Sequence, residues 1–303
     1  MTFCKTASIL VLIFYSLMSI SCNRNDHQTE TATSLISDTT MVDLWNGNRS
    51  QIRQVYEKEV LIAVLTATEN DYGPWEITET LDEYPGDEEA RVFNEKGHDL
   101  FVTIAGNQKF SNGDMIVIPK PMAKNLLGYR IPIIRKSDSN TFQDISNREE
   151  VQQLMHGIPE TWSDAVIFRK NGYYVVEEGD FDDVFDRLEN GLFDYTAFGA
   201  NEVQSVYENR ATQRDGLTID QNLLFFYPFP LVFYVNPNLP DLADRVEEGM
   251  QRIISSGVLD NIFKSYYGDI VEKLNLADRQ LFILDNPLVP DEFRDLKPDL
   301  ENL

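Results

Sequence analysis

The apolar positions of the chain fall into short runs and stripes that predict alternating strands and helices. Residues 60–65 are a continuous apolar run, typical of a strand that is buried on both faces. Residues 100–104 and 131–134 are similar runs, and we expect strands there as well. Between the first two, residues 87–96 have helical character and end at Gly97. The first half of the chain is therefore expected to contain both kinds of element.

The middle of the chain carries clearer helix boundaries. Ser146 and Glu149 have the spacing of a capping box, which predicts a helix start. Residues 161–164, Thr-Trp-Ser-Asp, predict a second helix start, with an acid three residues after the cap. That helix is expected to end at Asn171-Gly172, because glycine is a common residue just after a helix.

A strand, a helix and a second strand follow in close succession. Residues 173–176 and 193–197 predict the two strands. Between them an apolar stripe at helical spacing predicts an amphipathic helix, formed by Phe181, Val184, Phe185 and Leu188. Strands joined through a helix by short turns indicate a parallel sheet.

The last third of the chain repeats these signals in another order. Residues 223–227 and 231–235 are apolar and aromatic, and two prolines separate them. Pro240 precedes an apolar helical stripe, and residues 259–267 predict a further helix. Residues 286–303 are proline-rich and charged, and we expect a C-terminal tail that runs over the surface as a strap.

The N-terminus predicts export. Lys5 is the only charge in residues 1–21, and an apolar run over residues 7–18 follows it, as in a secretory signal peptide. Ser21-Cys22 after that run resembles the lipobox of bacterial lipoproteins, in which the cysteine is lipidated. Cys4 would be lost with the signal, so Cys22 would be the sole cysteine left. An ordinary cleaved signal and a retained membrane helix are the alternatives.

Composition narrows the possible partners. With 26 basic and 50 acidic residues the formal net charge is -24, which argues against nucleic acid and against anionic lipid heads. Residues 23–40 are polar and poor in aromatics. They predict a flexible tether, which we extend over residues 22–55, so that folded sequence begins near Tyr56.

Sequence signals of catalysis are missing. Of the three histidines, His27 lies in the expected tether, and His98 and His156 have no cysteine or acidic partner at ligand spacing, so we expect no metal site. The chain has no G-x-S-x-G, P-loop or G-x-G-x-x-G motif, and we expect no cofactor. Paired carboxylates stay open, since 50 acidic residues produce pairs by chance. We expect that the protein is not an enzyme.

From Leu127 onward the chain resembles the type II extracellular solute-binding proteins, in the branch of polar amino-acid receptors. The resemblance rests on LLGYRIPIIRK, ETWSDAVIFRKNGYYVV, VFDRLENGLFDYTAFGANEV, NLLFFYPFPLVFYV and LADRVEEGMQRIISSGVLDNIFKSYY. The matching positions include Leu188, Gly191, Asp194, Leu242, Gly257 and Ile262. Before Leu127 the chain departs from the pattern: the family often has Thr, a short gap and Arg, whereas Thr103 is followed here by Lys109.

The resemblance implies an α/β, two-lobed periplasmic-binding-protein type II fold. Two mostly parallel sheets, flanked by helices, would be joined by two hinge crossovers. Lobe one would combine residues 56–124 with residues 223–285, and lobe two would span residues 130–217. Gly128 and residues 217–222 would be the hinges, and a ligand between the lobes would close them.

Several residues are candidates for the ligand site. The helix start at Thr161, Trp162, Ser163 and Asp164 offers free amides to a carboxylate, an aromatic wall, and an acid for an ammonium group. Simple helix capping explains Asp164 as well. A second group comprises Arg130 for a carboxylate, Glu202 for an amine, Tyr227 for stacking and Trp75 as a lid from a loop. Their alternatives are a surface arginine, a helix cap and core aromatics.

The expected function follows from the resemblance. The protein would be an extracytoplasmic lipoprotein of the cell envelope, facing the periplasm, that captures a small polar, amino-acid-like ligand for a membrane permease. A binding module that reports to a signalling partner is the main alternative. A cell-envelope enzyme on the same scaffold and a purely structural lipoprotein are the others.

Overall fold

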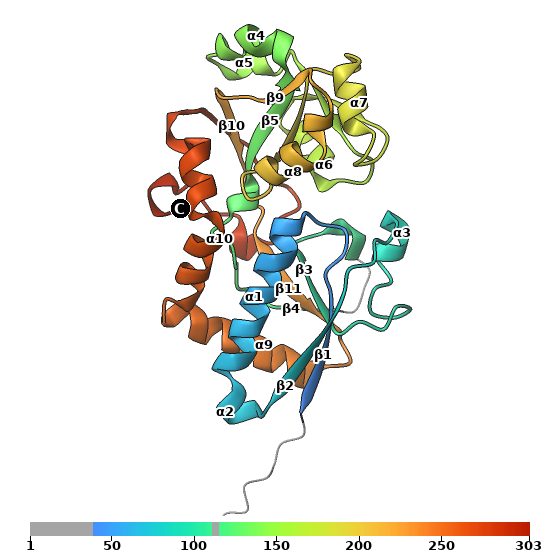
Figure 1. The fold of residues 1–303 in the computed structure, drawn as a ribbon, viewed down its shortest axis with the longest axis vertical. Coiled ribbons are helices and arrows are strands. Elements are labelled where there is room, and N and C mark those ends of the chain that lie inside the picture. The colour runs from blue at the N-terminus through green and yellow to red at the C-terminus, as the bar shows by residue number, and fades with distance from the viewer. Residues whose placement is uncertain (1–38, 111–114) are drawn as a thin grey trace, which may run out of the picture. The chain divides into compact units, whose positions relative to one another are not determined.

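A computed structural model describes residues 39–110 and 115–303 of the chain, which form an α/β fold with two mixed sheets flanked by helices (Figure 1). The expected signal peptide and Cys22 lie outside the described residues. None of the helices within the described ranges combines the length and the apolar character that crossing a bilayer requires.

The first sheet is the centre of lobe one and has five strands in the order β2-β1-β3-β11-β4. β1 is parallel to β2 and β3, whereas β11 is antiparallel to β3 and β4. Three long helices accompany it, and α1 packs against both α9 and α10. The elements are β1 Thr40–Trp45, α1 Gln51–Ala67, β2 Trp75–Thr80, β3 Leu100–Ile104, β4 Ile116–Val117, β11 Leu231–Val235, α9 Pro240–Ser255 and α10 Val258–Leu274.

Two predictions for the start of lobe one are wrong. Residues 60–65 lie in helix α1, where the buried side chains recur with helical spacing at Tyr56, Val60, Leu61, Val64 and Leu65. An apolar run of six fits a buried strand and a buried helix face equally well. The predicted tether also extends too far, because β1 and the first turn of α1 lie within residues 40–55.

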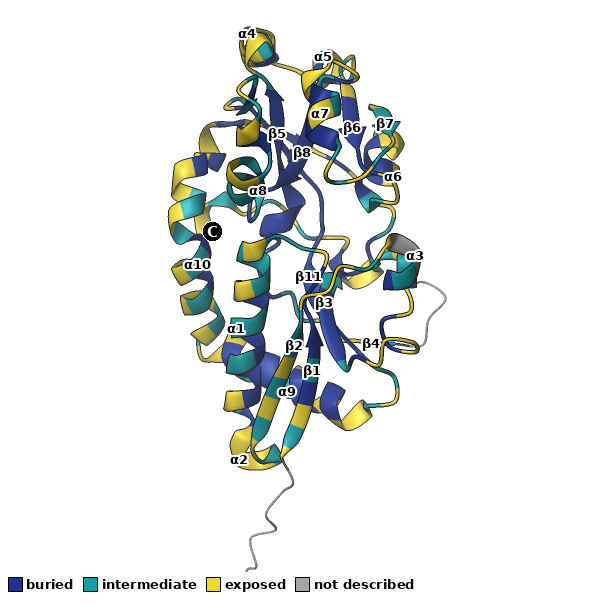
Figure 2. Ribbon diagram, turned by 45° about the vertical axis from the view of Figure 1, so that its right-hand side comes forward, coloured by how far each residue is buried: buried dark blue, intermediate teal, exposed yellow. Residues whose placement is uncertain are grey.

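The second sheet is the centre of lobe two, and its strands follow the order β12-β10-β5-β8-β6-β7, with β9 also paired to β5. β5 is antiparallel to β8, β9 and β10, whereas β6 is parallel to β7 and β8. β5, β8 and β11 are buried along almost all of their length (Figure 2). The strands are β5 Tyr129–Arg135, β6 Met155–Ile158, β7 Tyr174–Glu177, β8 Tyr195–Gly199, β9 Leu217–Ile219, β10 Leu223–Phe226 and β12 Gln280–Ile283.

The remaining helices are short. The predicted helix over residues 87–96 is one turn, α3, and the capping box is shifted by one residue, since Asn147 accepts from the Glu150 amide and Glu150 accepts from the Ser146 amide. Helices α6 and α7 lie where the sequence predicts helices, near residues 163 and 184. The bounds are α2 Glu69–Tyr72, α3 Gly86–Glu89, α4 Ser139–Gln143, α5 Arg148–Val151, α6 Ser163–Lys170, α7 Val184–Glu189 and α8 Val203–Asn209.

The fold class is confirmed, but the sheets are mixed rather than mostly parallel. β5 and β11 enter their sheets directly from the other lobe, so no helical crossover forces them to be parallel. The expected boundary of lobe one also differs. β10 and β12 stand at the two ends of residues 223–285, and both are hydrogen-bonded into the second sheet.

The chain segments that join the sheets touch each other. At Gly128 a Cβ atom would lie 2.2 Å from the Tyr227 carbonyl oxygen, so only glycine allows the two segments to approach so closely. The Tyr227 amide donates to the Gly128 carbonyl at 3.2 Å, and the Phe229 amide donates to the Asn125 side chain at 2.7 Å. The expected hinge at residues 217–222 instead continues along β5 as strand β9 and a turn, so the second crossing is at residues 227–230.

The C-terminal tail returns from the second sheet to the first. Asn286 donates to the Pro228 carbonyl at 2.7 Å, beside the second crossing. Val289 and Phe293 are then buried in an aromatic cluster of lobe one together with Trp45, Phe101, Phe110, Val232 and Tyr234. Finally the Asp299 amide donates to the Tyr129 hydroxyl at 2.6 Å. The tail is therefore a strap, as predicted, but two of its side chains belong to the core.

Candidate functional site

Three of the candidate residues meet in one buried group. Arg130 on β5 is 2% exposed and Asp164 on α6 is 4% exposed. Arg130 Nη2 lies 2.5 Å from Asp164 Oδ1, and the Tyr227 hydroxyl donates to the same oxygen at 2.6 Å. The second lobe and the second crossing thus supply the three side chains. Because charges are rarely buried unless they are paired, this group is built around its ion pair.

Glu202 approaches the same arginine from the turn before α8. Its Oε1 lies 3.9 Å from Arg130 Nη1, at the limit of an ion pair. Burial lowers the pKa of Arg130, but Asp164, Tyr227 and Glu202 outweigh it and raise the pKa above its ordinary value. Arg130 therefore stays charged, and the surface-arginine alternative is wrong.

Asp164 does not cap its helix. The N-cap residue of α6 is Trp162, and no side chain accepts a capping hydrogen bond there. The carboxylate instead turns toward Arg130 and Tyr227. The capping interpretation of Asp164 is therefore wrong.

Trp162 lines a small space next to Asp164. Its ring is 5.6 Å from Phe181 and 6.0 Å from Phe198 between centroids. The space is too narrow to admit a water molecule and is lined by His156, Gly157, Ile158, Pro159, Trp162, Asp164, Thr196 and Ala197. Burial and the nearby Arg130 lower the pKa of His156 well below its ordinary value, so this ring is neutral. Trp162 thus packs against two phenylalanine rings beside Asp164, and its contact with a ligand stays a prediction.

Three candidates take no part in this group. Thr161 is exposed, has a left-handed backbone with φ of 70°, and offers its amide to Glu177 at 3.3 Å. Ser163 begins α6 and makes no side-chain hydrogen bond within the described residues. Trp75 lies at the start of strand β2 and not in a loop. It pairs with Thr40, at the opposite end of β1 from Trp45.

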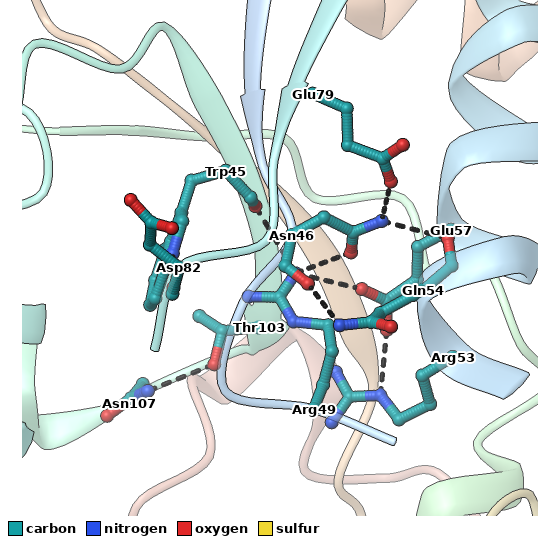
Figure 3. A network of polar contacts seen from close by, with 10 residues as sticks. All are labelled: Trp45, Asn46, Arg49, Arg53, Gln54, Glu57, Glu79, Asp82, Thr103 and Asn107. Carbon is teal, nitrogen blue, oxygen red and sulfur yellow. Dashed lines mark hydrogen bonds and ion pairs between the residues drawn. The ribbon is translucent and has the colours of Figure 1, made fainter. Parts of the chain in front are cut away.

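Lobe one contributes a second charged group that the sequence analysis missed. Arg49 lies in the turn before α1, and Arg53 lies in the first turn of this helix. Both contact the carboxylate of Glu57, a residue that is fully buried (Figure 3). Arg49 Nη1 lies 3.1 Å from Glu57 Oε2, and Arg53 Nε lies 2.7 Å from Oε1. Arg49 is also held by Asn46 Oδ1 at 3.2 Å and lies over the Trp45 ring. Two guanidinium groups therefore face one carboxylate.

The position at which the resembling family has arginine is occupied differently. Lys109 Nζ lies 2.5 Å from Glu89 Oε2, so its charge is already neutralised within lobe one. Thr103 accepts a hydrogen bond from Asn107 at 3.0 Å (Figure 3). The departure noticed in the sequence thus has a structural counterpart.

The two charged groups approach each other at the junction of the lobes. Burial lowers the pKa of Arg53, but Glu57 and then Glu202 of lobe two raise it above its ordinary value. Among the described residues, Arg53 and Glu202 nevertheless form no ion pair within 4.0 Å. Charges alternate in the order Arg49, Glu57, Arg53, Glu202, Arg130 and Asp164. The open link in this series is between Arg53 and Glu202.

Metal binding finds no support in this region. Across residues 39–110 and 115–303, no group of three or more His, Cys, Asp and Glu side chains is arranged to hold a metal ion.

Comparison with known structures establishes the fold. An ancestral arginine-binding protein bound to arginine is 13% identical, with a TM-score of 0.52, and covers 75% of this chain and 98% of its own. The probable amino-acid ABC transporter extracellular-binding protein ytmK from Bacillus subtilis is 15% identical, with a TM-score of 0.54. The match covers 77% of this chain and 100% of ytmK. A histidine kinase sensor domain with similarity to periplasmic binding proteins is 13% identical, with a TM-score of 0.54, over 77% and 97%.

These likenesses show that the chain has the two-lobed fold of periplasmic binding proteins. No protein-family model matches the chain, and no curated protein matches its sequence. The neighbours are covered almost completely, whereas about a quarter of this chain is left over. Their identities of 13–15% carry the fold and nothing about the ligand.

Proposed function

We propose that this protein is an extracytoplasmic solute-binding protein that captures a small zwitterionic, amino-acid-like ligand between its lobes and does no chemistry on it. The observation that carries the proposal is the alternating series of buried charges with its open link between Arg53 and Glu202. A zwitterion fits that link, since its carboxylate complements Arg53 and its ammonium group complements Glu202. The neighbours with this fold include amino-acid-binding proteins.

A panel of solutes tests the proposal by thermal shift. We expect at least one of L-arginine, L-glutamine, L-cystine and the other L-amino acids to raise the Tm, with maltose as an uncharged control. A ligand at a hundred times its Kd adds about 2.7 kcal/mol to the free energy of unfolding. X-ray scattering with that ligand should show a more compact particle, because a ligand that touches both lobes favours the closed form. An unchanged Tm across the whole panel would rule out an amino-acid ligand.

Delivery to a membrane permease is the role that we favour for the bound form. The neighbours include an ABC transporter binding protein, and one is a histidine kinase sensor domain, which supports sensing as the second candidate. Genes for a permease and an ATPase beside this gene would support transport, whereas a gene for a sensor kinase would support signalling.

We also propose that Cys22 carries a lipid that anchors the protein in the cell envelope. The proposal rests on the single cysteine that follows the apolar run of the expected signal peptide. Cys22→Ala should move the protein from the membrane fraction to the soluble fraction or leave an unprocessed precursor, as seen by immunoblotting. If Cys22→Ala stays in the membrane fraction and is processed normally, the anchor lies elsewhere.

A further inference from the structure

Two fully buried polar side chains near the junction lack hydrogen-bond partners. Asn201, in the turn between β8 and α8, is 0% exposed, and neither atom of its amide is hydrogen-bonded within the described residues. Tyr267 on α10 is also 0% exposed, and its hydroxyl has no partner there either. Burial raises the pKa of Tyr267 well above its ordinary value, and the adjacent Asn201 side chain opposes the shift, so the two polar side chains are neighbours.

Arg53 adds a cation with unused donors to this pair. Its Nε is bound to Glu57, and neither Nη nitrogen forms a hydrogen bond within the described part of the chain. Its side chain is 13% exposed, so water competes little for these donors. Tyr267 and Glu202 are both close enough to Arg53 to affect its pKa. We call these three residues the junction cluster: Arg53 on α1, Tyr267 on α10 and Asn201 in the β8–α8 turn.

The free-energy cost of leaving buried polar groups without hydrogen-bond partners indicates that a ligand binds at the junction cluster. A buried polar group without a partner destabilises a protein by roughly 1–3 kcal/mol, and native structures contain few of them. The junction cluster offers donors from a guanidinium, a hydroxyl and an amide. A carboxylate accepts up to four hydrogen bonds. Its negative charge would also balance the positive charge of Arg53, because the Glu57 carboxylate is shared with Arg49.

We propose that the junction cluster is the subsite that binds a carboxylate of the ligand, with Arg53 as its charged anchor and Asn201 and Tyr267 as donors. The inference rests on the proposed function, but it assigns carboxylate recognition to α1 and to the β8–α8 turn. Lys109, at the family position, is unsuited to this role because Glu89 already neutralises it.

Matched pairs of probes test the subsite. L-arginine with L-argininamide, and L-glutamine with L-glutaminamide, differ only in whether the carboxylate is present. Calorimetric titration of the wild type should show a clear preference for the acid of a pair. Arg53→Gln should weaken binding of the acid about ten- to a hundredfold and leave the amide nearly unaffected, so that the preference disappears. Asn201→Leu should weaken binding of the acid by about two- to tenfold.

Arg49→Gln is the matched control, because it removes the other partner of the same Glu57 carboxylate. Arg49 is already held by Asn46 and Glu57, so its replacement should lower the Tm and keep the preference for the acid. If Arg53→Gln weakens binding of the acid and of the amide equally, Arg53 acts by pairing with Glu202 across the lobes, and the carboxylate subsite is overturned. A preference that Arg53→Gln leaves intact indicates ordered water in the cluster and overturns it as well.

A thermal-shift experiment with acetate in place of amino acids tests this inference separately from the proposed function. Sodium acetate should raise the Tm of the wild type above that in sodium chloride of equal ionic strength, and Arg53→Gln should abolish the difference. If no amino acid binds but acetate still protects through Arg53, the subsite stands and the proposed ligand class falls. If neither amino acids nor acetate protect the wild type, both are overturned.

Discussion

Replacing Asp164 with alanine is expected to lower the free energy of unfolding by about 3–5 kcal/mol. The change would leave the Arg130 guanidinium, which is 2% exposed, with Glu202 at 3.9 Å as its nearest carboxylate. The Tyr227 hydroxyl would lose its acceptor as well. Removing one partner of a buried ion pair is costly because the other charge stays buried without compensation. Urea unfolding followed by circular dichroism measures the effect.

A double variant distinguishes the pair from other roles of Asp164. Arg130→Met combined with Asp164→Leu removes both charges and should recover much of the loss, since apolar side chains of similar size often replace buried pairs without penalty. A helix cap would predict a smaller loss for Asp164→Ala, roughly 0.5–2 kcal/mol, with no recovery in the double variant. A loss in that smaller range would contradict the buried pair.

Phe293→Ala should destabilise the protein by about 3–5 kcal/mol, although this residue lies in the tail. The Phe293 side chain is 5% exposed and belongs to the cluster of Phe101, Phe110 and Tyr234 in lobe one. Its loss would leave a cavity and release the segment that ties the second sheet back to the first. Unfolding in urea gives the stability. Hydrogen exchange at residues 286–303 should become faster at the same time.

Glu292→Ala is the matched control, because Glu292 is the exposed neighbour in the same turn. Surface changes of this kind usually alter stability by less than about 0.5 kcal/mol. If Phe293→Ala behaves like Glu292→Ala, the tail lies on the surface without contributing to the core.

The sequence predicts most of lobe two and little of the start of lobe one. The segments around α6, β7, α7 and β8 carry sharp boundaries, such as Asn171-Gly172, and the structure has the elements there. Residues 60–65 are ambiguous, because a six-residue apolar run lacks the length that reveals helical spacing. β1, with the sequence TMVDLW, fell within the expected tether, and its pairing with β2 and β3 becomes visible only in three dimensions.

The sequence indicates which residues gather at the candidate site, but not which of them contact each other. Arg130, Asp164, Glu202 and Tyr227 were each candidates, and the structure brings them together. No sequence signal shows that Asp164 turns away from its helix end toward Arg130, since capping and pairing use the same residue type at the same place. Arg49 and Arg53 were missed because a tether was expected there. Two arginines four residues apart, followed by Glu57, were the available signal.

The chain crosses between the sheets four times, counting the return of the tail, and this orders events during synthesis. The first sheet needs β11, so it stays incomplete until residue 235 has left the ribosome. The second sheet needs β12, which lies 151 residues after the start of β5 at Tyr129, since 280 minus 129 is 151. Contacts so distant in sequence slow folding. Neither lobe can therefore be completed as a contiguous piece of the nascent chain, and the last strand to be made closes the edge of a sheet whose first strand was made much earlier.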